Sequence, residues 1–384
     1  MKHWKSITAL GLTASMVCQA VIPIYADTSK PADYDDQYWE RLTDNRLEFD
    51  EIEDRVVNFS SDYLSASYST SKLYAPYQAA VDSLESSIED SQSALKDAKE
   101  NGDVEDITYY TIALKSEQGT KKAYESVIKR FTGPSERVLN TTVKGGMVLG
   151  AETLMINYYR LAAKAEMDDA NVAQAQASYD SLVTQRGLGM ATDNDVLTVQ
   201  DALLTIKVQQ QTTRNQLSQL KQNLCMLLGW EYSDDIELGA IPEPDESRVA
   251  EMNPETDVEK AIGNNYTLSD LRHTSASGVN AKKNRLEQME EMEEKIRVGV
   301  NTVYSNVLTA QNNYYAASSA YEASRITYEG SGRQYQLGML SALQYQQLTM
   351  AFLADKTVYE NAKLDYFEAI QMYDWTIKGN YSFE

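Results

Sequence analysis

Apolar residues in the middle and at the end of the chain recur at alternating steps of three and four. Such a seam runs from Ala151 to Leu182, where Asp168 is its one break, and from Val196 to Leu227. The ranges 286–321 and 345–373 repeat the pattern. These steps align apolar side chains along one stripe of a helix and are typical of coiled-coil packing. The pattern predicts four long helices in two antiparallel pairs.

A short stretch with Leu-Gly-Met separates the two helices of each pair. The stretches are GLGMATDNDVL at 187–197 and QLGMLSALQYQ at 336–346, and their glycines are Gly189 and Gly338. Glycine adopts the left-handed conformation that ends a helix at little cost. Each stretch therefore predicts the end of one helix and a tight turn into the next.

The residues after each glycine predict how the next helix begins. Thr192 and Ser341 are good N-cap residues, and Asp195 and Gln344 follow three positions later. Ser-x-x-Gln matches a capping box, and Thr-x-x-Asp is a near relative that places an acid at the positive end of the helix. These features by themselves describe good hairpin turns and do not identify a partner.

The fold class that follows is all-α, with long antiparallel coiled-coil helical hairpins in two tandem repeats and little or no β-strand. Prolines and acidic residues after Trp230 indicate a linker between the repeats. The predicted organisation is a first repeat at 27–230 with an extra helical pair at 72–131 and a tip at 187–195, a linker at 231–255, and a second repeat at 256–384 with a tip at 336–344.

The first 26 residues have the features of a secretory signal peptide. Lys2 and Lys5 precede an apolar run, and a small-residue end suggests cleavage after Ala26. Val17 is a poor residue before Cys18 for lipid attachment, so we favour secretion over a lipid anchor. The sequence thus predicts an exported protein of the cell envelope.

Composition then narrows the function. The 384 residues carry a formal net charge of −22, which disfavours binding to nucleic acid. Beyond the predicted signal peptide, His273 is the one histidine and Cys225 the one cysteine, and Cys225 lies in an apolar helical stretch that predicts buried packing. With no nucleotide-binding loop or metal-ligand motif, we expect no enzymatic activity, cofactor or metal site.

The duplicated Gly-x-x-Ser/Thr-x-x-Asp/Gln motif at the bend of two coiled-coil hairpins resembles the TolC-like outer-membrane efflux (outer membrane factor) family. The segments LSQLKQNLCMLLG, LGAIPEP and VYENAKLDYFEAIQMYDW are similar to that family as well, and the resemblance covers roughly residues 145–384. It implies a homotrimer that forms a helical tunnel, whose tips dock the adaptor (membrane fusion) protein of an efflux pump. The docking residues so implied are Arg186, Gly187, Leu188, Gly189, Thr192 and Asp195, with Gln336, Leu337, Gly338, Ser341 and Gln344.

The chain departs from that family where each repeat would carry a strand hairpin. HTSASGVNAKKNRLE, at 273–287, has no apolar alternation, and the extra helical pair occupies the corresponding place in the first repeat. We therefore predict that the membrane barrel of the family is lost or vestigial here. The expected location is the outer membrane or periplasm if the host has an outer membrane, and otherwise the cell surface or the extracellular space.

Two functions follow from these observations. The first is an efflux or export conduit that forms an oligomeric tunnel. The second is an exported coiled-coil structural or adhesive envelope protein that kept the fold without transport. A conduit must close into a ring, so the oligomeric state separates the two.

Overall fold

The computed structural model describes residues 30–31, 34–137, 142–231 and 235–380. The predicted signal peptide at 1–26 lies outside the described residues. The described elements, in chain order, are α1 (Asp36–Thr43), β1 (Arg46–Leu47), a 3-10 turn (Phe49–Glu51), α2 (Ile52–Phe59), α3 (Ser61–Lys72), α4 (Ala75–Asn101), α5 (Val104–Arg137), α6 (Gly145–Gly187), α7 (Asp193–Leu227), β2 (Glu237–Leu238), α8 (Glu246–Glu251), α9 (Pro254–Asn264), α10 (Tyr266–His273), α11 (Val279–Gln336) and α12 (Ala342–Ile377).

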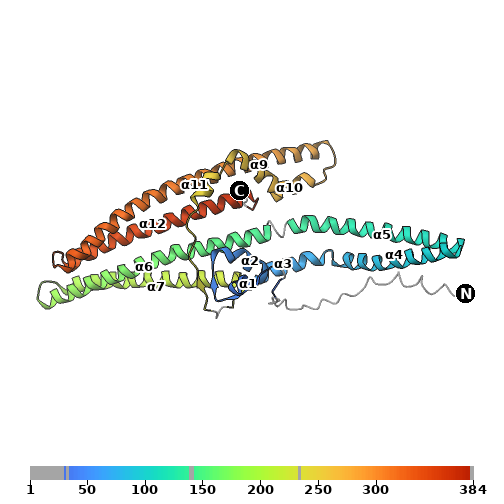
Figure 1. The fold of residues 1–384 in the computed structure, drawn as a ribbon. Coiled ribbons are helices and arrows are strands. Elements are labelled where there is room, and N and C mark those ends of the chain that lie inside the picture. Colours follow the sequence, from blue (N-terminus) through green and yellow to red (C-terminus); the bar gives the residue numbers. More distant parts are fainter. Residues whose placement is uncertain (1–29, 32–33, 138–141, 232–234, 381–384) are drawn as a thin grey trace.

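Two long antiparallel hairpins, α6–α7 and α11–α12, dominate the molecule, and their tips lie at the same end (Figure 1). Helix α6 has 43 residues and α11 has 58. At about 1.5 Å per residue, these helices are roughly 65 and 87 Å long. The all-α prediction, with its two tandem long hairpins, is confirmed.

The four long helices lie in the order α7, α6, α12, α11, so that α6 and α12 are central and α7 and α11 form the edges (Figure 1). One apolar cluster joins the first hairpin to α2 and α12 through buried residues such as Met155, Leu224 and Phe367. A second joins α11 and α12 to α9 and includes Val300 and Tyr366. Some of the predicted seam residues, including Ala151, Leu224, Val300 and Tyr366, belong to these cores, which lie toward the ends of the long hairpins opposite their tips. Cys225 is buried in the first core, as predicted.

Polar side chains join the two hairpins along the α6–α12 interface. Arg160 donates to Asp365 at 2.5 Å, and Lys356 pairs with Glu166 at 2.7 Å. Deeper in the interface, the indole of Trp375 donates to the buried carboxyl of Glu152 at 2.7 Å. These contacts connect residues about 200 positions apart and fix how the two repeats pack.

Burial gives Glu152 unusual acid–base behaviour. Desolvation raises the pKa of its carboxyl to about 7, against a smaller lowering by the Trp375 hydrogen bond and by the charge of Lys378. The negative charge of the nearby Glu53 raises this pKa further. The protonation state of this interface therefore changes near neutral pH.

The interior of the second hairpin is a continuous column of aromatic rings. Successive ring centroids lie 4.6–5.9 Å apart, within the range of favourable aromatic pairs. The first hairpin instead holds a polar cluster in which Lys164 and Thr213 both donate to Asp168. The column comprises Tyr366, Tyr314, Tyr359, Tyr321, Phe352, Tyr328, Tyr345 and Tyr335.

A third hairpin, α4–α5, extends away from the tips (Figure 1). Gly102, with a φ of 73°, ends α4 in the left-handed conformation, and α5 starts two residues later. Lys121 and Glu85 bridge the two helices at 2.6 Å. This hairpin occupies residues for which the sequence predicted an extra helical pair.

The segment between the two repeats is partly ordered into elements. Strand β2 pairs in parallel with β1, with Arg46 opposite Glu237 and Leu47 opposite Leu238. Helix α8 follows, and Arg248 binds Asp374 of α12 at 2.6 Å. Among the described helices, none is both long and apolar enough to cross a membrane.

Candidate functional site

The predicted tip residues form two tight turns of the same design. Gly189 and Gly338 have φ angles of 74° and 72°, so both adopt the left-handed conformation. In the first turn, the Met190 amide donates to the Gln185 carbonyl at 2.8 Å. In the second, the Met339 amide donates to the Gln334 carbonyl at the same distance. The prediction that each glycine ends a helix in the left-handed conformation is confirmed.

Both returning helices start with a reciprocal capping box. The hydroxyl of Thr192 accepts from the Asp195 amide at 3.2 Å, and the Asp195 carboxylate accepts from the Thr192 amide at 2.8 Å. Ser341 and Gln344 make the same pair of contacts at 3.2 and 3.0 Å. Backbone and side-chain hydrogen bonds from Thr192 lower the pKa of Asp195, so this cap stays ionised at neutral pH. The predicted caps are confirmed.

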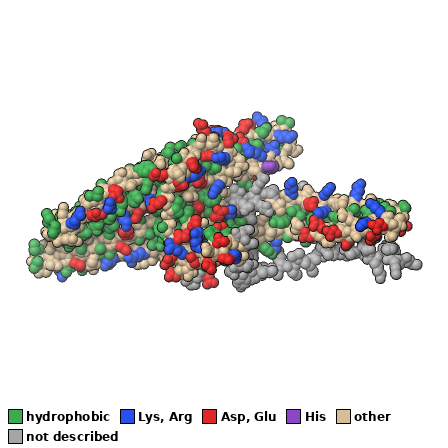
Figure 2. Space-filling model, in the orientation of Figure 1, with side chains coloured by type: hydrophobic (Ala, Val, Ile, Leu, Met, Phe, Trp, Pro, Cys, Tyr) green, Lys and Arg blue, Asp and Glu red, His purple; other side chains and the backbone are tan. Residues whose placement is uncertain are grey.

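Each tip exposes one leucine and one methionine. Leu188 and Leu337 are 72% and 76% exposed, and Met190 and Met339 are 73% and 69% exposed. Figure 2 shows hydrophobic side chains at this end of the molecule. The sequence singled out the leucines as candidate contacts but did not include the methionines, although the repeated Leu-Gly-Met was the available signal. Unbranched, polarizable methionine suits an adaptable contact surface.

The two tips differ in their flanking chemistry. Arg186, at the end of α6, pairs with Asp193 across the first turn at 3.3 Å. Tyr335 occupies the corresponding place in the second tip and stacks on Tyr345 at a centroid distance of 4.8 Å. The first tip therefore has an ion pair beside its turn, and the second tip has two stacked tyrosine rings there. Gly187 and Gln336 lie at the ends of α6 and α11, so every predicted tip residue belongs to one of these two turns.

His273 lies in α10, away from the two tips (Figure 1). His273 is exposed, and its Nδ1 lies 2.6 Å from the Ser269 carbonyl oxygen. Within the described residues, no group of three or more histidine, cysteine, aspartate or glutamate side chains is arranged to hold a metal ion.

Comparison with known proteins gives structural neighbours only. No family model and no curated protein matches the chain. Solved structures that are similar include the channel protein CusC, with 11% identity, 86% of this chain and 96% of that chain covered, and a TM-score of 0.49. The outer-membrane channel OprN has 13% identity, coverage of 93% and 96%, and a TM-score of 0.46. The Campylobacter jejuni outer-membrane channel CmeC has 12% identity, coverage of 68% for both chains, and a TM-score of 0.43. At these TM-scores the similarity assigns neither family nor function.

Proposed function

We propose that this chain is a TolC-like component of an efflux or export conduit in the cell envelope. In this proposal, copies of the chain, three by the family resemblance, join their long hairpins into a helical tunnel. The tips of the tunnel dock an adaptor protein of the membrane fusion type. The observation that carries the proposal is the pair of matched tips at one end of the molecule, each with an exposed Leu-Gly-Met turn on a rigid capped hairpin.

The edge helices support the assembly. On α7, Leu197, Leu204 and Val208 are exposed at steps of seven and four, and Val208 is 66% exposed. On α11, Leu308, Tyr315 and Ile326 are exposed at steps of seven and eleven, and Ile326 is 64% exposed. Separations of seven and eleven residues return to nearly the same face of a helix. Each outer edge of the four-helix layer thus carries an apolar stripe, and we propose that α7 of one copy packs on α11 of the next.

The exposed leucines provide the direct test of docking. Because Leu188 and Leu337 contribute little buried area, Leu188→Asp combined with Leu337→Asp should leave the melting temperature nearly unchanged. The double variant should fail to co-purify with the membrane-fusion-type adaptor of the same cell, identified by mass spectrometry. Leu286→Asp, an exposed leucine of α11 far from the tips, is the matched control and should keep the partner.

Each other outcome has a defined meaning. If the double variant unfolds, the leucines are structural and the tips are only turns. If it folds and keeps the adaptor, docking at the tips is wrong. A protein that captures no adaptor and stays monomeric supports the structural or adhesive envelope function instead.

A further inference from the structure

The hairpin α4–α5 carries a row of lysines on the edge of α5 that faces away from α4. Lys115, Lys122 and Lys129 follow one another at steps of seven, or about 10.5 Å, and so lie on nearly the same side of the helix. Tyr124, nine residues from Lys115 and thus on the opposite side, contacts Tyr77 of α4. The three lysines are exposed and make no ion pair or side-chain hydrogen bond within the described part of the chain. On a chain with a net charge of −22, this row indicates an anionic partner.

The opposite edge of the same hairpin is acidic. Asp82 and Glu89 are separated by seven residues on α4, and Asp90 lies beside them. Ser91 and Ala98, each nine residues further on than one of the first two acids, are buried, so the acids lie on the side of α4 away from α5. All three carboxylates are exposed. Figure 2 shows Lys and Arg side chains along the upper edge of this hairpin and Asp and Glu side chains along its lower edge.

Contacts inside the hairpin show which residues of the two helices lie at the same level along its axis. Glu85 pairs with Lys121 at 2.6 Å, and Ser87 donates to Glu117 at 2.8 Å. Because the helices are antiparallel, each step forward along α4 corresponds to one step back along α5. Lys96, which continues the acidic row at a further step of seven, is therefore level with about position 109, where the chain has no base.

This register places the acids of one edge level with lysines of the other. Asp82 is level with Lys122, and Glu89 and Asp90 are level with Lys115. Copies related by rotation about an axis parallel to the hairpin keep every residue at its own level. An α5 edge packed on the α4 edge of the next copy would therefore bring these opposite charges together.

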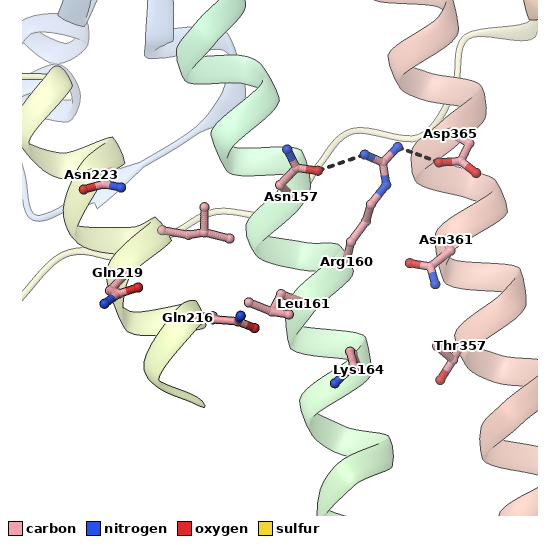
Figure 3. Close-up of a pocket in the computed structure, with 11 residues that line it drawn as sticks. Asn157, Arg160, Leu161, Lys164, Gln216, Gln219, Asn223, Thr357, Asn361 and Asp365 are labelled. Atoms are coloured by element: carbon pink, nitrogen blue, oxygen red, sulfur yellow. Dashed lines mark hydrogen bonds and ion pairs between the residues drawn. The ribbon is translucent and has the colours of Figure 1, made fainter. Parts of the chain in front are cut away.

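The proposed contacts of the long hairpins bring the same sides of neighbouring copies together. Arg160 and Asp365 join α6 to α12 (Figure 3), which leaves α7 and α11 as the outer edges of the layer. In Figure 1, α4 lies on the α7 side of the molecule and α5 on the side of α12 and α11. A ring in which α7 meets α11 of the next copy therefore also turns the α4 edge toward that copy. The hairpin extends beyond α10 and α11 (Figure 1), so its outer part is free to make this contact.

We propose that the α5 edge binds the α4 edge of a second copy of this chain, so that the α4–α5 hairpins form a second ring at the end of the molecule opposite the tips. The inference rests on the proposed tunnel and adds an interface that the apolar edges do not include. The charges determine which edges meet, because two α5 edges would place lysines against lysines and two α4 edges acids against acids. Exposed ion pairs contribute little affinity, which the apolar edges supply instead.

Disulfide cross-linking tests the contact directly. Gly119 on α5 and Ser86 on α4 are exposed, lie at the same level, and face outward on opposite edges, so cysteines there can join only different copies. A Cβ atom at Gly119 would meet no other atom within 4 Å. Gly119→Cys combined with Ser86→Cys, in the signal-free protein oxidised with copper phenanthroline, should give covalent trimers. The native Cys225 is buried.

The matched control moves one cysteine along the same edge. Gly119→Cys combined with Ser93→Cys places the second thiol seven residues, or about 10.5 Å, from the required level. A disulfide needs Cα atoms within about 7 Å of each other, so this pair should not cross-link.

A charge exchange tests why these edges meet. Added to the cysteine pair, Lys122→Glu should slow cross-linking about fivefold or more in dilute buffer, and further addition of Asp82→Lys should restore the rate. Lys129→Glu makes the same change in the same row but is level with about position 76, where no acid lies nearby. This control should cross-link like the unchanged cysteine pair.

Native mass spectrometry of the same samples separates this inference from the tunnel. A trimer that forms no cross-link would overturn the contact between the α4–α5 hairpins and leave the tunnel standing. A protein that stays monomeric would overturn both. Binding of wild type to phosphatidylglycerol vesicles that Lys122→Glu loses would assign the lysine edge to an anionic surface and overturn the contact as well.

Discussion

At the scale of single residues, the capping hydroxyls of the tips determine how firmly the returning helices begin. Thr192→Ala or Ser341→Ala removes one side of a capping box and should lower the free energy of unfolding by about 0.5–2 kcal/mol. Unfolding in urea measures this change in the free energy of unfolding. Thr198→Ala, an exposed threonine one turn and a half further along α7, should be neutral or slightly stabilising, because alanine is the better helix former. Equal effects at 192 and 198 would contradict a capping role.

The tip glycines are required for their backbone conformation rather than for space. A Cβ atom at Gly189 or Gly338 would meet no other atom within 4 Å. Gly189→Ala and Gly338→Ala should therefore each cost roughly 1 kcal/mol through the positive φ alone. Gly187→Ala, at a helical position that is equally open, should stabilise or leave the protein unchanged in the same thermal unfolding assay. A larger loss at position 187 would refute this explanation.

The buried carboxyl of Glu152 predicts a pH dependence of stability. It titrates near its ordinary pKa of 4.5 when the chain is unfolded and near 7 when folded, so the folded chain holds the proton more tightly. The stabilisation by that proton is complete below about pH 4.5 and is lost as the pH rises to about 7, with an upper bound of about 3.5 kcal/mol at 1.4 kcal/mol per tenfold change in proton affinity.

Glu152→Gln should remove this loss, because the amide oxygen still accepts from Trp375 and carries no charge. Unfolding at about pH 5 and pH 8 should then differ less in the variant, which should be the more stable protein at the higher pH. Glu287→Gln, an exposed partner of Lys283, should keep the wild-type pH dependence. An unchanged pH profile in Glu152→Gln would mean that this carboxyl does not control the interface.

At the scale of elements, the hairpins were predictable because their signals are local. The three-four seam and the Leu-Gly-Met turns each lie within a few tens of residues, so helix type and turn position follow directly from the sequence. The ion pair between the hairpins was not predictable, because Arg160 and Asp365 come from two helices whose relative rotation depends on tertiary packing. The exposure of Met190 and Met339 was not predictable either, because it depends on which side of each turn faces outward.

The aromatic column predicts a marked difference between ring loss and hydroxyl loss within α11. Tyr321 stacks on Tyr359 at 4.9 Å and on Phe352 at 5.8 Å. Tyr321→Ala should cost about 1–3 kcal/mol, because it interrupts stacking and leaves a partly filled gap. Tyr321→Phe keeps the ring and should stay within about 0.5 kcal/mol of wild type in chemical unfolding. Comparable losses in both variants would show that the hydroxyl, not the stack, carries the contribution.

At the scale of the whole molecule, the apolar edges of the four-helix layer predict self-association. Val208→Glu places a charge in the proposed α7–α11 contact and should shift the protein toward monomer without lowering its melting temperature. Ala202→Glu adds the same charge at an exposed position of α7 six residues earlier, on another side of the helix from the edge stripe, and should assemble like wild type. Sedimentation velocity at several concentrations measures both variants. Identical assembly in both would exclude the α7 edge as an interface.

The central claim is that several copies close into one helical tunnel, and native mass spectrometry of the signal-free protein tests it most directly. The proposed conduit predicts a single closed species of three chains that persists on dilution, since a ring satisfies every α7 and α11 edge. A monomer at all concentrations, or an open-ended series of oligomers without a preferred size, would contradict it.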